Sequence, residues 1–117
     1  MTALATLRAA MVATLSDAGI RATDDPRNVN PPCVLIGLAE GARITACAYT
    51  GTIPVTVVAP GAGNADAAGW LDETATTVAG LLGAVTWSAD LYAIASVPGG
   101  LLSYVLSVPA AWEVPAP

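Results

Sequence analysis

The sequence from Thr74 to Trp112 carries a single charged residue, Asp90. A stretch this poor in charge must either cross a membrane or be covered by protein. Glycines and prolines interrupt it at Gly80, Gly83, Pro98, Gly99, Gly100 and Pro109. Neither Lys nor Arg flanks it to fix an orientation in a bilayer. We therefore expect no transmembrane helix, and a fold that covers these residues with other protein surface.

Length and composition set limits on that fold. A chain of 117 residues corresponds to one domain, residues 1–117. Of its residues, 55% are hydrophobic and only 11% are charged. A domain of this size leaves much of its surface exposed even when folded, so a monomer has too little interior for this apolar excess. Contacts between subunits are the expected place for the remainder.

Positive charge is confined to the first part of the chain. Four arginines are its only cationic residues, at positions 8, 21, 27 and 43, and the net charge is -5. Because nothing after Arg43 is positive, we expect no basic patch for nucleic acid and no attraction to an anionic membrane surface. The N-terminus lacks the basic and continuous apolar regions of a signal peptide, so the protein is expected in the cytosol of the cell that makes it.

Two amphipathic helices are predicted by apolar residues that recur every three or four positions. Thr2 can cap the first helix, and Gly19 ends it. Its inner stripe is Leu4, Leu7, Met11, Leu15 and Ala18. Asn64 can cap the second helix, and Gly83 weakens its end. Its inner stripe is Leu71, Ala75, Val78, Leu82 and Val85.

Five strands are predicted between and after these helices. The run CVLIGL at 33–38 is apolar throughout, as expected for a strand covered on both faces. A turn at 39–42 leads to a returning strand at 43–50, which makes a hairpin, and a turn at Gly51 leads to a third strand at 53–60. Two last strands follow at 91–97 and 101–108, with a proline-rich C-terminal tail at 109–117. The expected fold is α+β in the order α-β-β-β-α-β-β, with two helices packed on a mainly antiparallel sheet of about five strands.

Two cysteines, Cys33 and Cys47, lie in the first two predicted strands. With Leu38 paired to Arg43 across the hairpin, Cys33 lies opposite Ala48, and Cys47 lies on the other face of the sheet. A register shift of one residue would bring the two sulfur atoms together. No CxxC pair and no His accompanies them, so we expect two free thiols and no metal site.

No group of residues predicts catalysis or cofactor binding. The segment GAGNAD at 61–66 imitates a phosphate-binding loop, but Asp66 stands where the dinucleotide fingerprint has its third glycine, so a tight turn with a helix cap explains it better. The carboxylates form adjacent pairs, Asp24 with Asp25 and Asp72 with Glu73, which do not converge on one substrate. No His or Lys is present to activate a serine. We expect neither an enzyme nor a cofactor.

A polar arm and two tryptophans provide the candidate contact residues. The arm, residues 20–32, joins the first helix to the first strand, and its prolines predict extended chain at residues 30–32. The tryptophans lie on separate elements with no basic groove beside them, which favours core packing and subunit contact over base stacking. The predicted interface residues are Asp24, Asp25, Arg27, Asn28, Asn30, Trp70 and Trp112.

The segments DDPRNVNPPCVLIGL (24–38) and IPVTVVAPGAGNADAAGWL (53–71) resemble small neck and tail proteins of long-tailed phages of actinobacteria, and tail terminator proteins in particular. The similarity extends from the first helix through the second and rests on structural motifs. It implies an α+β subunit that forms a ring, commonly a hexamer, on the head-proximal end of the tail tube. Such a ring stops polymerisation of the major tail tube protein and presents a face to the head-completion proteins. The implied locations are the virion and, during assembly, the host cytoplasm.

Composition agrees with that role, and two alternatives stay open. The apolar surplus suits subunit interfaces, and the acidic surface suits a channel through which DNA slides without binding. The polar arm would then place charged groups at a contact within the ring. Another neck component, a stopper or adaptor, is the first alternative. A small cytosolic ligand-binding domain that uses the PGAGN turn at 60–64 is the second.

Overall fold

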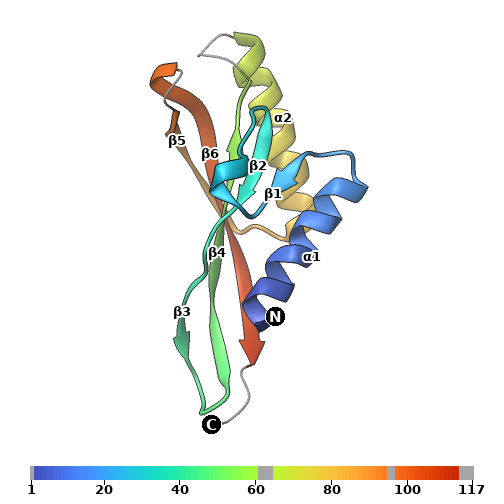
Figure 1. The fold of residues 1–117 in the computed structure, drawn as a ribbon, viewed down its shortest axis with the longest axis vertical. Coiled ribbons are helices and arrows are strands. Elements are labelled where there is room, and N and C mark those ends of the chain that lie inside the picture. The colour runs from blue at the N-terminus through green and yellow to red at the C-terminus, as the bar shows by residue number, and fades with distance from the viewer. Residues whose placement is uncertain (1, 61–64, 95–96, 114–117) are drawn as a thin grey trace.

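A computed structural model describes residues 2–60, 65–94 and 97–113 of the chain. In these residues the protein forms two α-helices and a mixed sheet of six strands (Figure 1). The elements are α1 (Ala3–Asp17), β1 (Ala22–Thr23), the 3-10 helix η1 (Pro26–Asn28), β2 (Cys33–Ile36), β3 (Glu40–Arg43), β4 (Ala48–Val58), α2 (Ala65–Leu82), β5 (Thr86–Ile94) and β6 (Val97–Glu113). The predicted α+β fold, with two helices and a mainly antiparallel sheet, is confirmed.

The centre of the sheet is the pair β4 and β6. These strands pair antiparallel over eleven positions, from Ala48 opposite Glu113 to Val58 opposite Ser103. β5 lies on the far side of β6, whereas β3 and β2 lie on the far side of β4, opposite its first and second halves. β1 adds a short parallel strand outside β2. One margin of the sheet is therefore β5, and the other is formed by β1, β2 and β3.

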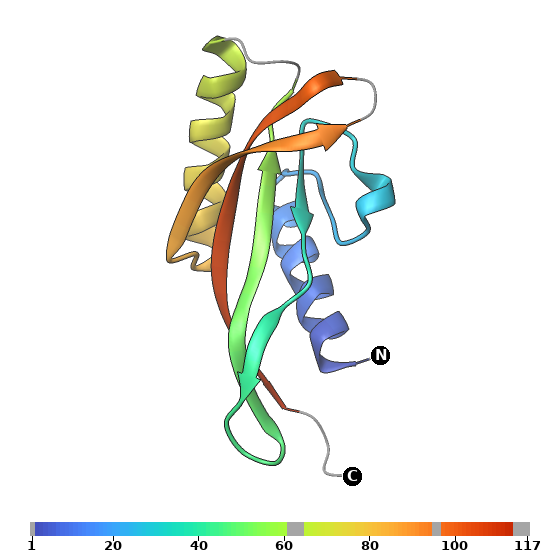
Figure 2. The same cartoon turned by 90° about the vertical axis from the view of Figure 1, so that its left-hand side faces the viewer.

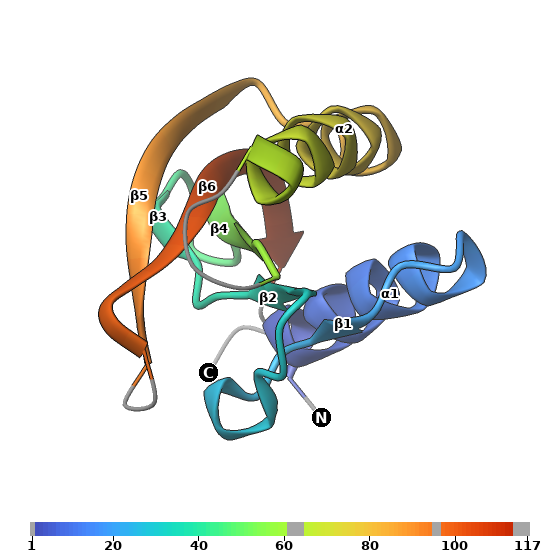
Figure 3. The same cartoon turned by 90° about the horizontal axis from the view of Figure 1, so that it is seen from above.

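Both helices lie on the same side of the sheet, as the view from above shows (Figure 3). Side chains alternate along a strand, and on β4 the core residues are Ile53, Val55 and Val57. Leu106 and Val108 of β6 lie opposite two of them in the ladder, and all five side chains are buried. Burial of each such side chain contributes roughly 1.5–3 kcal/mol before the loss of chain entropy is subtracted.

The helix α1 begins and ends where the sequence predicts. The Thr2 hydroxyl oxygen accepts a hydrogen bond from the Ala5 N–H at 3.1 Å, and Gly19 follows the helix with a φ of 80°. In the predicted stripe, Met11 and Leu15 are buried, Leu4 and Leu7 are half-buried, and Ala18 is exposed. The stripe therefore faces the protein along its length and leaves it only at the last position.

The helix α2 buries most of its predicted stripe. Leu71, Ala75 and Val78 are buried and Leu82 is half-buried, but Val85 is exposed. Val85 falls beyond Gly83, whose φ of 73° ends the helical path, so the stripe stops one turn earlier than predicted. The predicted cap Asn64 and most of the GAGNAD segment lie outside the described residues. Neither described helix combines the length and the apolar character needed to cross a bilayer.

The predicted hairpin between residues 33–38 and 43–50 is wrong. β2 pairs with the second half of β4, and Cys33 lies opposite Val58 rather than Ala48. The chain turns at residues 44–47 instead of 39–42, because the Thr45 hydroxyl oxygen accepts hydrogen bonds from the N–H groups of Cys47 (3.4 Å) and Ala48 (3.0 Å). Both cysteines are free, and burial raises the pKa of the Cys33 thiol.

Gly51 lies inside β4, opposite Gly41 of β3, and the turn predicted there is absent from the described chain. The two backbones meet so closely that a Cβ atom on Gly51 would overlap the Glu40 carbonyl oxygen. A Cβ atom on Gly41 would lie 2.5 Å from the Thr50 carbonyl oxygen and 2.7 Å from Cη2 of Trp112. Glycine at both positions therefore permits β3 to join the sheet.

The last two strands are longer than predicted. β5 begins at Thr86 rather than at residue 91, and β6 continues to Glu113, well into the segment 109–117 that was expected to be a tail. The early part of β5 pairs with β6 from Ser107 backwards, and the end of β6 pairs with the first half of β4. These long-range pairings extend both strands. Residues 114–117 lie outside the described residues.

Candidate functional site

The polar arm is held in shape by contacts within itself. Asp25 caps η1, since its Oδ1 accepts hydrogen bonds from the Arg27 backbone N–H (3.0 Å) and from Arg27 Nε (3.2 Å). Its Oδ2 forms an ion pair with Arg27 Nη2 at 3.0 Å. The Arg27 side chain and backbone N–H lower the pKa of the Asp25 carboxyl, and the carboxylate raises the pKa of Arg27. Asp24 beside them is exposed. Two predicted interface residues therefore stabilise the arm itself.

Further hydrogen bonds tie the two ends of the arm together. The Asn30 carbonyl oxygen accepts from Arg21 Nη1 at 3.2 Å, and the Arg21 carbonyl oxygen accepts from the Val34 N–H at 2.9 Å. Asn28 ends η1 and is exposed, as are Asn30 and Arg27. The arm therefore doubles back at η1 instead of running straight into β2, and it presents these three predicted contact residues to solvent.

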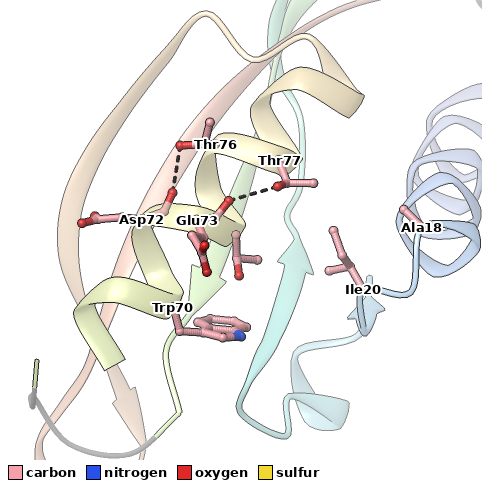
Figure 4. Close-up of a pocket in the computed structure, with 8 residues that line it drawn as sticks. Ala18, Ile20, Trp70, Asp72, Glu73, Thr76 and Thr77 are labelled. Atoms are coloured by element: carbon pink, nitrogen blue, oxygen red, sulfur yellow. Dashed lines mark hydrogen bonds between the residues drawn. The ribbon is translucent and has the colours of Figure 1, made fainter. Parts of the chain in front are cut away.

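An open groove of about 680 Å³ lies between α2 and the residues that follow α1 (Figure 4). Its lining residues are Ala18, Ile20, Trp70, Asp72, Glu73, Thr74, Thr76 and Thr77. Trp70 and Ile20 come from opposite sides of the groove and are both half-buried. The groove thus combines apolar side chains from two elements with carboxylates and hydroxyls of α2.

A smaller hollow of about 240 Å³ adjoins this groove and shares Ile20, Trp70 and Thr74 with it. Its other lining residues are Gly19, Arg21, Pro32 and Cys33. Because Arg21 also binds the Asn30 carbonyl oxygen, Trp70 and the base of the arm belong to one continuous surface. The sequence predicted Trp70 and the arm as separate contact residues, and the structure brings them together.

Three polar side chains of this groove, those of Asp72, Thr76 and Thr77, form hydrogen bonds within the fold. Asp72 Oδ1 accepts a hydrogen bond from the Tyr104 hydroxyl at 2.8 Å, and this bond raises the pKa of Tyr104. The hydroxyls of Thr76 and Thr77 donate to backbone carbonyl oxygens one turn earlier in α2. In the described part of the chain, no three His, Cys, Asp or Glu side chains gather so that they could hold a metal ion. Ile20 and Trp70 are the large apolar side chains that the groove offers for contact with another protein.

Trp112 lies on a second surface, at the other end of α1. Its ring stacks on Tyr49 of β4, with ring centroids 5.9 Å apart and planes inclined by 7°. It also lines a hollow of about 450 Å³ between β6 and the first half of α1. The other lining residues are Ala3, Thr6, Leu7, Ala10, Ala111 and Glu113. The Trp70 groove instead contains residues that follow α1, so the two predicted tryptophans do not share a site.

The β5 margin of the sheet is a surface that sequence reasoning missed. Every residue from Thr86 to Leu91 is exposed, although this length of β5 pairs with β6. The exposed fraction is 51% for Trp87, 59% for Leu91 and 67% for Val85 just before the strand. No described strand pairs with the outer edge of β5. The period-two pattern of Trp87, Ala89 and Leu91 could have identified the strand, but its place at the margin depends on the distant pairing of β4 with β6.

No model of a known protein family matches this chain, and no curated protein matches it at a significant level. Function must therefore be inferred from its own surfaces. Three of them are candidates for contact with other proteins: the arm with the Trp70 groove, the Trp112 hollow and the β5 margin.

Proposed function

We propose that the protein is a phage tail terminator, a structural subunit that forms a ring, a hexamer, on the head-proximal end of the tail tube. The observation that carries this proposal is the β5 margin, where Trp87 and Leu91 are exposed on a strand whose outer edge pairs with no described strand of this small acidic chain. An exposed apolar edge strand of this length requires a protein partner or invites aggregation. The resemblance of segments 24–38 and 53–71 to tail terminators supplies the kind of assembly.

Ring formation explains how such a subunit ends a polymer. Head-to-tail contacts that close into a ring bury the same two surfaces on every copy and leave no free end. One face of the ring binds the major tail tube protein and stops its polymerisation. The other face binds the head-completion or stopper protein, so that the tail joins the head. The role is structural, requires no cofactor, and belongs in the neck of the virion after assembly in the host cytoplasm.

The charge balance supports a conduit for DNA. The net charge is -5, no cationic residue follows Arg43, and Arg27 is already paired with Asp25. Few phosphates could be neutralised by such a surface, so DNA passes through the channel without specific binding.

Deletion of the gene from the parent phage, followed by electron microscopy of the lysate, tests the proposal. A terminator mutant should give tail tubes of abnormal and variable length beside filled, unjoined heads, and a plasmid copy of the gene should restore normal tails. Tails of normal length that fail to join heads would instead identify a stopper or adaptor. Normal infectious particles would exclude the assembly role, and a thermal-shift screen with nucleotides and anions would then test the ligand-binding alternative.

A further inference from the structure

Two exposed apolar sites lie on opposite margins of the sheet. On one margin, Leu38 follows β2 and has an exposed fraction of 74%. On the other margin, Val85 lies just before β5 and Trp87 is its second residue, and both side chains are more than half exposed. We call residues 37–40 the Leu38 margin. Residues 85–91 belong to the β5 margin described above, and we call them the Trp87 margin. Neither margin has a further strand outside it among the described residues, since β1 pairs only with positions 34 and 35 of β2.

The two margins begin at the same level along the strands. The Gly37 N–H donates to the Pro54 carbonyl oxygen at 2.8 Å, and Pro54 lies opposite Ser107 in the central ladder. The Val85 N–H donates to the Ser107 carbonyl oxygen at 3.0 Å. Gly37, Pro54, Ser107 and Thr86, which is the ladder partner of Ser107, therefore form one row across the sheet, and an apolar side chain lies next to each end, Leu38 at one and Val85 at the other. Figure 2 shows the start of β5 and the link between β2 and β3 on opposite sides of β4 at similar height.

Strand direction favours contact between these margins on neighbouring copies. β5 and β4 are both antiparallel to β6, so β5 runs in the direction of β4. β3, which continues the Leu38 margin, runs against β4. When two copies stand side by side in the same orientation, β5 of one copy therefore meets an antiparallel segment of the next, the geometry in which edge strands pair best.

Charge disfavours the symmetric alternative at β5. Asp90 is the only charged residue on that strand and lies at its centre, between Thr86 and Ile94. A two-fold contact that pairs the full length of two β5 strands is centred on residue 90 and would set Asp90 against Asp90, and like charges directly opposite each other are destabilising. The Leu38 margin carries one charged residue, Glu40, and the exposed Arg43 lies three residues farther along β3. A head-to-tail contact instead keeps the acidic positions apart, because Glu40 is level with Thr52 of β4 and Asp90 is level with Val58.

We propose that the Leu38 margin of one copy packs against the Trp87 margin of the next, so that copies join head to tail and close into a ring. This inference rests on the proposed function, because it names the contact through which the ring would form. The occupant of each margin is thus a second copy of this chain, and each copy uses both margins.

Paired single variants test the contact. Leu38→Asp disables one margin and Val85→Asp disables the other, and both side chains are exposed, so each variant should keep the far-ultraviolet circular dichroism of the unmodified protein. In sedimentation velocity, each variant alone should be monomeric, with association at least about thirtyfold weaker than in the unmodified protein. An equimolar mixture should form dimers and nothing larger, because one intact Leu38 margin can still meet one intact Trp87 margin. Leu81→Asp, at an exposed apolar position of α2 outside both margins, should leave assembly unchanged.

Three outcomes would overturn the inference. Rings that persist in both variants would show that other surfaces form the contact, and the terminator function would stand. Failure of the mixture to form dimers would indicate a symmetric contact at one margin. An unmodified protein that stays monomeric at all concentrations would exclude this contact between free copies, whereas the tail lengths of the deletion mutant would still decide the function.

Discussion

Replacement of Gly51 with alanine should detach β3 from β4 without unfolding the domain. The new methyl group would overlap the Glu40 carbonyl oxygen and lie 2.5 Å from Gly41 Cα. Both obstacles are backbone atoms, which cannot rotate away as a side chain would, so the pairing of β3 with β4 has to open. Among the described residues, none of the buried core side chains belongs to residues 37–52. The helices and the rest of the sheet therefore keep their packing.

The expected cost follows from what the opening releases. Overpacking of a closed site costs about 1–3 kcal/mol. Opening of the four paired positions would lose hydrogen bonds worth about 1 kcal/mol each, and the backbone entropy regained by the freed residues offsets that loss. Weakening of the stack between Tyr49 and Trp112 would remove about 0.5–1.5 kcal/mol more. We expect the free energy of unfolding to fall by about 1–3 kcal/mol.

Urea denaturation would measure this loss, and hydrogen exchange with mass spectrometry would locate it. Amides of residues 40–43 should exchange quickly, while the amides of β4 that bond to β6 stay protected. Gly80→Ala is the matched control, because α2 has open space around Gly80 and alanine should stabilise that helix by about 0.5–1 kcal/mol. Unchanged stability together with full protection of residues 40–43 in the Gly51→Ala variant would refute the close approach of the two backbones.

Three further predictions concern titration, thiols and DNA. The hydrogen bond to Asp72 raises the pKa of Tyr104 above its ordinary value of 10.0. The contribution of this hydrogen bond to the free energy of unfolding is therefore fully present below pH 10 and is lost as the pH rises through the folded-state pKa of Tyr104. Asp72→Asn should return this titration, followed by tyrosinate absorbance, toward the ordinary range and leave assembly unchanged; an unmoved titration would contradict the bond. A thiol reagent should find two thiols in the denatured, unreduced chain. In the native protein it should modify Cys47 before the buried Cys33, and equal rates of modification would argue against the burial of Cys33. Duplex DNA should not shift in a gel at moderate salt, and a salt-sensitive shift at micromolar protein would count against the conduit.

Local patterns in the sequence predicted the helices well, because their signals lie within a few residues. Thr2 caps α1, and Met11 and Leu15 are buried at the predicted spacing. The pairing and the bounds of the strands were predicted less well. A turn at 39–42 was as plausible from residue types as the observed turn at 44–47, and the Thr45 hydroxyl that favours the latter gives only a weak sequence signal. Gly51 was read as a turn residue because glycine marks both turns and close backbone contacts.

The candidate contact surfaces were predictable only in part. Exposed polar residues in the arm follow from composition, but the use of Asp25 to cap η1 depends on the local path of the chain. The sequence predicts Trp70 as a contact residue, whereas its position opposite Ile20 results from the packing of two elements far apart in the sequence. The β5 margin could not be predicted, because its exposure follows from the order of strands across the whole sheet.

The eleven-position ladder between β4 and β6 also determines how the subunit would respond to force. Antiparallel hydrogen bonds lie perpendicular to the strands, so a pull along β4 loads the whole ladder in shear. A pull across the sheet at β5 would instead load and break the hydrogen-bonded pairs between β5 and β6 one after another. The domain is therefore mechanically anisotropic. It should resist tension between its two ends far better than peeling at its β5 margin.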